Sequence, residues 1–220
     1  MDLGADLGAN LRHITNWNDS VWSHVYGEHP FTKGIIFAPT ILRPKSRGSV
    51  TLGGPSISDA PIIDTNYLDH QDDVQTLVEG LKIVKSLEET EPFKRYDIRL
   101  IQDQMLCGDR FKPYSEEYYE CFAREYLTTH YHPVGTCAMG PEAKKRSVVN
   151  HELKVHGIGG LRVADASIMP KLVGANTNAA CVMIGEKAAS MILADAKRNG
   201  KKGGWQAETG TFGKVSQEEL

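Results

Sequence analysis

Residues 131–140 read YHPVGTCAMG, in which a histidine precedes a proline and a run of mostly small residues. Two more short segments follow, GGLRVADASIMP at residues 159–170 and GANTNAA at residues 174–180. Each segment alone is a modest signal, whereas the three in this order form a highly specific pattern. We therefore expect the chemistry of the chain to lie in these segments.

Helical patterns surround these segments. Apolar side chains recur every three or four positions over residues 72–89, which predicts an amphipathic helix. A second helix is expected after Ser115, an N-cap residue, and buries an aromatic face. Asn176 or Thr177 can cap a third, long helix that ends near residue 199.

Extended patterns occupy the first third of the chain. Residues 34–42 and 49–52 are apolar runs separated by a basic turn, RPKSRG, which predicts two strands joined by that turn. Residues 61–64 add a third short strand. Residues 161–164 are expected to form one more short strand, ahead of the last helix.

Composition excludes several classes of protein. The chain has 220 residues, and its 25 Lys and Arg against 28 Asp and Glu give a net charge of −3 without a long block of one sign. Nucleic-acid binding and polybasic membrane attachment thus lack an electrostatic basis. No run approaches the roughly 18 apolar residues of a membrane span, and the first residues do not resemble a signal peptide, so the compartment stays open. The four cysteines have the spacing of neither metal-binding pairs nor a dense disulfide frame; they are Cys107, Cys121, Cys137 and Cys181.

The three segments resemble those of the glucose-methanol-choline (GMC) family of FAD-dependent oxidoreductases, above all its glucose dehydrogenase-like members from insects. The resemblance covers roughly residues 34–197 and includes RPKSRGSV at residues 43–50 and VVNHELKVHG at residues 148–157. Asn150 departs from the family pattern, in which Asp is more usual. The implied fold is α+β: a substrate domain with an antiparallel sheet and flanking helices, plus the last strand and helix of an FAD-binding domain.

The resemblance also implies a reaction and two catalytic residues. GMC oxidoreductases act on the CH–OH groups of alcohols or sugars, pass a hydride to N5 of the flavin, and use quinone or oxygen as electron acceptor. By resemblance His132 is the base that removes the hydroxyl proton, a task that suits an imidazole near pH 7. Asn176 matches the second active-site position, where its amide could bind the substrate oxygen.

Cofactor contacts follow from the same resemblance. Asp165 and Ala166 match the position that approaches the ribityl and pyrophosphate portion of FAD. Asn176, Thr177 and Asn178 match the start of the helix whose backbone N–H groups face the flavin. No metal is expected.

Simpler interpretations compete with each of these roles. His132 could be a structural histidine, Asn176 a plain N-cap, and Asp165 an ordinary residue of a turn after a strand. His130 and His132 form an HxH pair that on a strand would face one way, as metal ligands do, but the sequence supplies no further ligand nearby. Cys137 lies five residues after His132, yet a Cys–His nucleophilic pair normally joins residues that are distant in sequence. The resemblance implies that this cysteine is a packing residue.

The chain has no G-x-G-x-x-G βαβ unit, the Rossmann element that binds the ADP half of FAD in this family. The glycine-rich string at residues 157–161 precedes a strand rather than a helix and is expected to be a turn. We therefore expect the C-terminal part of a longer enzyme, inactive without its N-terminal half. The alternative is a truncated, catalytically silent GMC-derived domain with a binding or structural role.

These expectations divide the chain into four parts. Residues 1–33 lead into the fold without a core of their own, and residues 34–140 form the substrate and catalytic domain. Residues 141–197 form a linker and the strand and helix that contact FAD, and residues 198–220 a mobile tail. The identity of the alcohol is not evident from the sequence.

Overall fold

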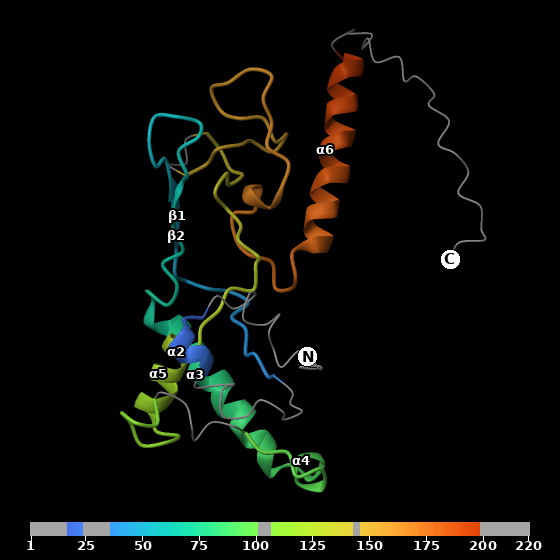
Figure 1. Ribbon diagram of the computed structural model, residues 1–220. Helices are drawn as coiled ribbons and strands as arrows, with labels where there is room; N and C mark the ends of the chain where they lie inside the picture. The colour runs from blue at the N-terminus through green and yellow to red at the C-terminus, as the bar shows by residue number, and fades with distance from the viewer. Residues whose placement is uncertain (1–16, 24–35, 101–106, 143–145, 199–220) are drawn as a thin grey trace, which may run out of the picture.

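The computed structural model describes residues 17–23, 36–100, 107–142 and 146–198 (Figure 1). Most of the lead-in segment, and the expected tail after Arg198, lie outside the described residues. The elements in chain order are α2 (Asp19–Trp22), β1 (Ser49–Thr51), β2 (Ile62–Asp64), α3 (Gln71–Ser86), η2 (Leu87–Glu89), α4 (Glu91–Arg95), α5 (Glu116–Glu125), η3 (Ala166–Ile168) and α6 (Asn178–Arg198). This mixture of helices with an antiparallel strand pair confirms the α+β class.

Helices α3 and α5 pack side by side and form the first of two cores (Figure 1). The predicted amphipathic stretch is α3 followed by η2. Ser115 caps α5 as expected, since its hydroxyl accepts a hydrogen bond from the Tyr118 N–H at 3.2 Å. Both helix predictions are confirmed. The buried side chains of this core are Leu68, Val74, Leu77, Val78, Leu81, Cys107, Tyr118, Tyr119, Cys121 and Ala123.

A disulfide bond joins Cys107 to Cys121 inside this core. It ties the chain before α5 to the middle of that helix and closes a loop of 14 residues. Cysteine spacing did not predict this bond. The reason is that a pairing depends on which residues the fold brings within about 6 Å of one another between Cα atoms.

The basic turn at residues 43–48 is bound to the start of α3. Asp73, whose side chain is buried, accepts hydrogen bonds from the backbone N–H groups of Lys45 at 2.8 Å and Ser46 at 2.7 Å, and from the Ser46 hydroxyl at 2.5 Å. Burial by itself would raise the pKa of Asp73, but these hydrogen bonds outweigh it and hold the pKa below its usual range. The turn is therefore anchored by a buried carboxylate.

The strand prediction for the first third of the chain is partly wrong. β1 pairs antiparallel with β2, with Val50 opposite Ile63, whereas residues 36–42 form no strand. These residues lie against α3 instead: a Cβ added to Gly80 would come within 2.7 Å of the Pro39 side chain. Gly80 permits this close approach, and Pro39 has no N–H to donate to a strand partner.

The second core lies under α6 and is built mostly from irregular chain. The strand prediction for residues 161–164 is wrong. These residues contribute only an isolated antiparallel bridge, between Arg162 and Lys154. Helix α6 confirms the prediction of a long last helix. None of the described helices has the length and apolar composition that crossing a bilayer requires. The buried side chains of this core are Val149, Leu153, Ile168, Met169, Ile184 and Ala188.

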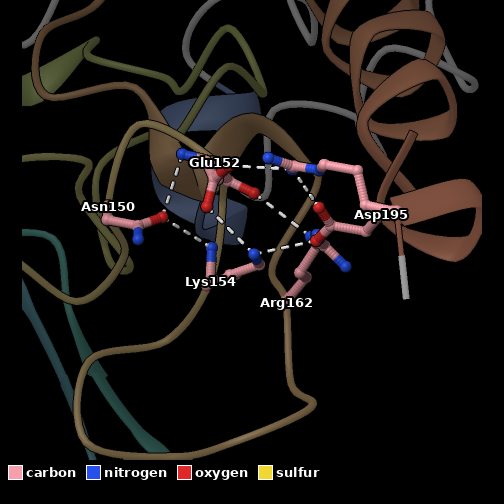
Figure 2. Close-up of polar contacts among 6 residues, drawn as sticks. Asn150, Glu152, Lys154, Arg162 and Asp195 are labelled. Atoms are coloured by element: carbon pink, nitrogen blue, oxygen red, sulfur yellow. Dashed lines mark hydrogen bonds and ion pairs between the residues drawn. The ribbon is translucent and has the colours of Figure 1, made fainter. Parts of the chain in front are cut away.

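An ion-pair network holds the C-terminal end of α6 (Figure 2). Asp195 on α6 is contacted by Lys154 at 2.8 Å, by Arg162 at 2.5 Å, and by Arg198. Hydrogen bonds from Lys154, then Arg162, outweigh burial and lower the pKa of Asp195. Glu152 forms an ion pair with Lys154 at 2.9 Å and so extends the network into the turn at residues 150–154.

Asn150 explains how this turn is formed. Its side-chain oxygen accepts hydrogen bonds from the backbone N–H groups of Glu152 at 2.9 Å and Lys154 at 3.0 Å (Figure 2). Leu153, between them, has a positive φ of 65°. An Asp, the more usual residue of the family pattern, would offer the same oxygen, so this departure leaves the turn intact.

Candidate active site

The segment before the site turns sharply at Tyr131, which has a positive φ of 59°. The rings of His130 and His132 stack on each other with centroids 5.3 Å apart. Residues 130–132 form no strand, so the pair lacks the strand geometry that an HxH metal site would have. Within the described parts of the chain, no cluster of three or more His, Cys, Asp or Glu side chains could hold a metal ion.

His132 contacts the residues that immediately precede α6. Its Nε2 lies 2.9 Å from the amide nitrogen of Asn176, and its Nδ1 lies 3.0 Å from the hydroxyl oxygen of Thr177. Both ring nitrogens are therefore engaged by two consecutive residues. The structure thus brings together the two residues that the resemblance assigned to catalysis, although 44 positions separate them in the chain.

Asn176 is not the N-cap residue of α6. The first backbone bond of the helix runs from the Cys181 N–H to the Thr177 carbonyl at 2.9 Å, which places Thr177 at the N-cap position. Asn176 is exposed and directs its amide to His132. The interpretation of Asn176 as a plain cap is therefore wrong.

The loop after His132 is fixed by backbone hydrogen bonds to η3. The N–H of Cys137 donates to the Ser167 carbonyl at 3.0 Å, and that of Met139 donates to the Ile168 carbonyl at 2.8 Å. Gly135 has a positive φ of 91°, and a Cβ there would lie 3.1 Å from the Met169 carbonyl oxygen. Glycine is therefore needed where the loop meets η3.

Asp165 and Ala166 lie where this loop meets η3. The Asp165 carboxylate accepts a hydrogen bond from the Ser167 N–H at 2.8 Å and caps the short helix. That geometry matches the simpler interpretation, a turn residue, although Asp165 stays exposed with acceptor capacity left over. Ala166 is half-buried and packs against the second core.

The N-terminus of α6 lies directly beside the His132–Asn176 pair. The N–H groups of Asn178, Ala179 and Ala180 come before the first intrahelical bond and have no partner within the helix. Such groups, together with the positive end of the helix dipole, attract electron-rich ligands. A ring nitrogen that can accept a proton therefore lies next to a place that favours negative charge.

Sequence reasoning missed the role of the Thr177 side chain. The residue was expected to act through its backbone, yet its hydroxyl contacts His132 and the residue is only 8% exposed. A threonine directly before a helix usually signals a cap, and that signal hides any contact to a distant residue. Cys137 is a free, half-buried cysteine, as expected for a packing residue.

Comparison with known proteins gives consistent matches. Residues 44–185 match the family described as GMC oxidoreductase. The chain is 44% identical over 161 residues to glucose dehydrogenase [FAD, quinone] of Drosophila melanogaster. The matched stretch covers 73% of this chain and 26% of that protein. It is 39% identical to oxygen-dependent choline dehydrogenase of Sinorhizobium fredii over 68% of this chain and 26% of that protein.

A solved structure shares the fold. The crystal structure of pyridoxine 4-oxidase from Mesorbium loti matches with a TM-score of 0.59 and 31% identity, over 70% of this chain and 28% of that one. The chain thus spans about a quarter of the length of the curated relatives that it matches.

Proposed function

The chain belongs to the GMC oxidoreductase family, and we propose that it is the C-terminal, base-carrying part of an FAD-dependent oxidoreductase acting on CH–OH groups. The contact between His132 and Asn176 is the observation that carries this proposal. Oxidation of an alcohol requires a base for the hydroxyl proton and a donor that holds the oxygen. A histidine ring nitrogen beside a side-chain amide supplies both.

The names of the relatives support the substrate class. They include a glucose dehydrogenase, choline dehydrogenases and an alcohol dehydrogenase, each named for a donor that carries a hydroxyl group. These names include both quinone and oxygen as acceptors. We therefore propose a small alcohol or sugar as the substrate and leave the acceptor open between quinone and oxygen.

The residues beside His132 fit one end of FAD. The first-turn N–H groups of α6 can face the electron-rich edge of an isoalloxazine ring, and Asn178 and Ala179 are exposed there. Asp165 and Ala166 would lie toward the ribityl and pyrophosphate portion. The described residues contain no βαβ unit for the ADP half, so they would hold the cofactor from the flavin end alone.

In this proposal the proton moves to His132. In this step the substrate oxygen replaces Nε2 as the acceptor of the Asn176 amide, which holds the oxygen in place. The freed lone pair of Nε2 then accepts the hydroxyl proton of the substrate as the C=O bond forms. When bound, FAD supplies the acceptor for the hydride that leaves the same carbon. The helix N-terminus at α6 keeps a favourable place for negative charge next to this step.

The proposal assigns the catalytic and substrate role to residues 34–140 and the flavin contact to residues 141–197. The contact between His132 and Asn176 crosses this division. The same contact favours an active site over a silent domain, since a silent domain has no need to keep a base and an amide donor together.

A fusion protein tests the proposal. The chain is joined behind the portion of Drosophila melanogaster glucose dehydrogenase that precedes the matched stretch, and flavin reduction by a panel of alcohols and sugars is followed anaerobically by stopped flow. We expect His132→Ala to slow flavin reduction by about 10²–10⁴-fold, the range typical of a lost general base, with FAD still bound.

The matched control is His151→Ala, which removes an exposed histidine of the 150–154 turn and should leave the rate unchanged. Equal rates for His132→Ala and the unmodified fusion would overturn the assignment of the base. An unmodified fusion that binds FAD but stays inert toward every donor would favour the silent-domain alternative.

A further inference from the structure

Thr177 has a side chain that the helix alone does not explain. Its backbone carbonyl accepts the first hydrogen bond of α6, from the Cys181 N–H. The residue is buried, with 8% of its surface exposed. Its hydroxyl oxygen lies 3.0 Å from Nδ1 of His132. Thr177 therefore joins the start of α6 to the ring of the proposed base.

The two contacts of His132 determine which ring nitrogen carries the proton. A primary amide nitrogen only donates hydrogen bonds, so Nε2 must accept from Asn176 and has no proton of its own in the neutral ring. The proton of the neutral imidazole then lies on Nδ1 and is donated to the Thr177 oxygen. Two consecutive residues thus select one tautomer.

We propose that Thr177 is a positioning residue that keeps the proton on Nδ1 of His132 and so leaves Nε2 as the basic nitrogen. This role rests on the proposed function, in which the alcohol O–H bond breaks and an Nε2–H bond forms while the hydride passes to FAD. The Thr177 oxygen accepts from Nδ1–H both before and after this transfer. The ring is therefore held in one orientation through the step.

The tautomer can be read directly. In the ¹⁵N-histidine-labelled 220-residue chain, the chemical shifts of Nδ1 and Nε2 distinguish a protonated from a bare ring nitrogen, and the loss of one signal set in His132→Gln assigns the residue. We expect the Nδ1–H form to predominate in the unmodified chain. Thr177→Val keeps the shape but removes the acceptor, and should raise the share of the Nε2–H form several-fold.

Thr177→Ser is the conservative variant and keeps a hydroxyl, so it should retain the Nδ1–H form. Thr76→Val is the control substitution: the Thr76 hydroxyl donates to the Asp72 carbonyl on α3 at 2.7 Å, away from His132. It should leave the shifts of His132 unchanged. A tautomer ratio that is the same in Thr177→Val and in the unmodified chain would overturn the assignment, whether or not the protein is an active enzyme.

Kinetics in the fusion protein then test the positioning role. We expect Thr177→Val to slow flavin reduction by about five- to tenfold, the effect of one lost hydrogen bond, and Thr177→Ser to recover most of that loss. A shifted tautomer with an unchanged rate would overturn the positioning role. An unchanged rate in His132→Ala would instead overturn the proposed function, so the two failures are distinguishable.

Discussion

The α3–α5 region and the α6 region are stabilised by different kinds of interaction. In the first, two helices bury their apolar faces against each other, and a disulfide bond and the buried Asp73 add cross-links. In the second, irregular chain packs under one helix, and ion pairs hold that helix at its far end (Figure 2). Among the described residues, the α6 region also has the smaller set of buried side chains.

Exposed apolar side chains make the same point. Four large apolar residues of α6 are about half or more exposed: Val182, Met183, Ile192 and Leu193. On α3 the exposed large apolar residue is Ile83. The candidate site therefore sits on the region whose surface is less completely covered, as expected if the proposed flavin site is completed by other parts of a longer protein.

The largest expected effect concerns retention of FAD at the α6 region of the 220-residue chain. We expect the purified 220-residue chain to hold no FAD, because the diphosphate and ribose contacts of a βαβ unit are missing from these residues. Several charge-assisted hydrogen bonds of roughly 1.5–3 kcal/mol each would be lost, which weakens binding by many powers of ten. Absorbance between about 350 and 500 nm measures this, and a stoichiometric flavin spectrum would contradict it.

The disulfide bond tests whether the α3–α5 region is stabilised by its own cross-links. Changing both Cys107 and Cys121 to Ser should lower the free energy of unfolding by about 3 kcal/mol, because the unfolded chain regains the entropy of a 14-residue loop. Urea denaturation followed by circular dichroism measures the loss. Cys137→Ser, in a free cysteine, is the control, and a loss of the same size there would remove the distinction.

Asp73 tests the polar cross-link of the same region. Asp73→Asn should cost about 2 kcal/mol of stability at neutral pH, since a buried carboxylate that accepts several hydrogen bonds is replaced by a neutral amide. Asp72→Asn, at its exposed neighbour, should have almost no effect.

The pH dependence of the Asp73 contribution has a definite sign. The pKa of this carboxyl is lower in the folded chain than its usual value of 3.8, so its stabilisation is complete above pH about 5 and is lost as the pH falls toward and below 3.8. Between pH 7 and pH 3, the melting temperature should fall less steeply for Asp73→Asn than for the unmodified chain. Parallel curves would show that Asp73 does not couple stability to pH.

Asn176 gives the smallest expected effect and belongs to the α6 region. In the fusion protein, Asn176→Asp should slow flavin reduction by about five- to tenfold and lower the flavin midpoint potential, because a carboxylate replaces the amide donor beside a place where negative charge develops. Stopped flow and potentiometric titration measure the two quantities. If neither changes, Asn176 has no part in the chemistry.

Much of the helical framework and of the site could be predicted from sequence. The spacing of Val74, Leu77 and Leu81 is a local signal, because residues three and four apart share one face of a helix. The choice of His132 and Asn176 came from short motifs that resemble those of a known family. Neither prediction needed any knowledge of which distant segments meet.

Tertiary structure decided everything that depends on segments far apart in the chain. Residues 36–42 lie against α3, with Pro39 beside Gly80, instead of forming the expected strand, and Cys107 meets Cys121 although their spacing gave no sign of it. The Thr177 hydroxyl reaches His132, 45 positions away, where the sequence indicated only a helix cap. The physical reason is that periodicity and capping act within a few residues, whereas packing and site geometry arise only when folding brings distant segments together.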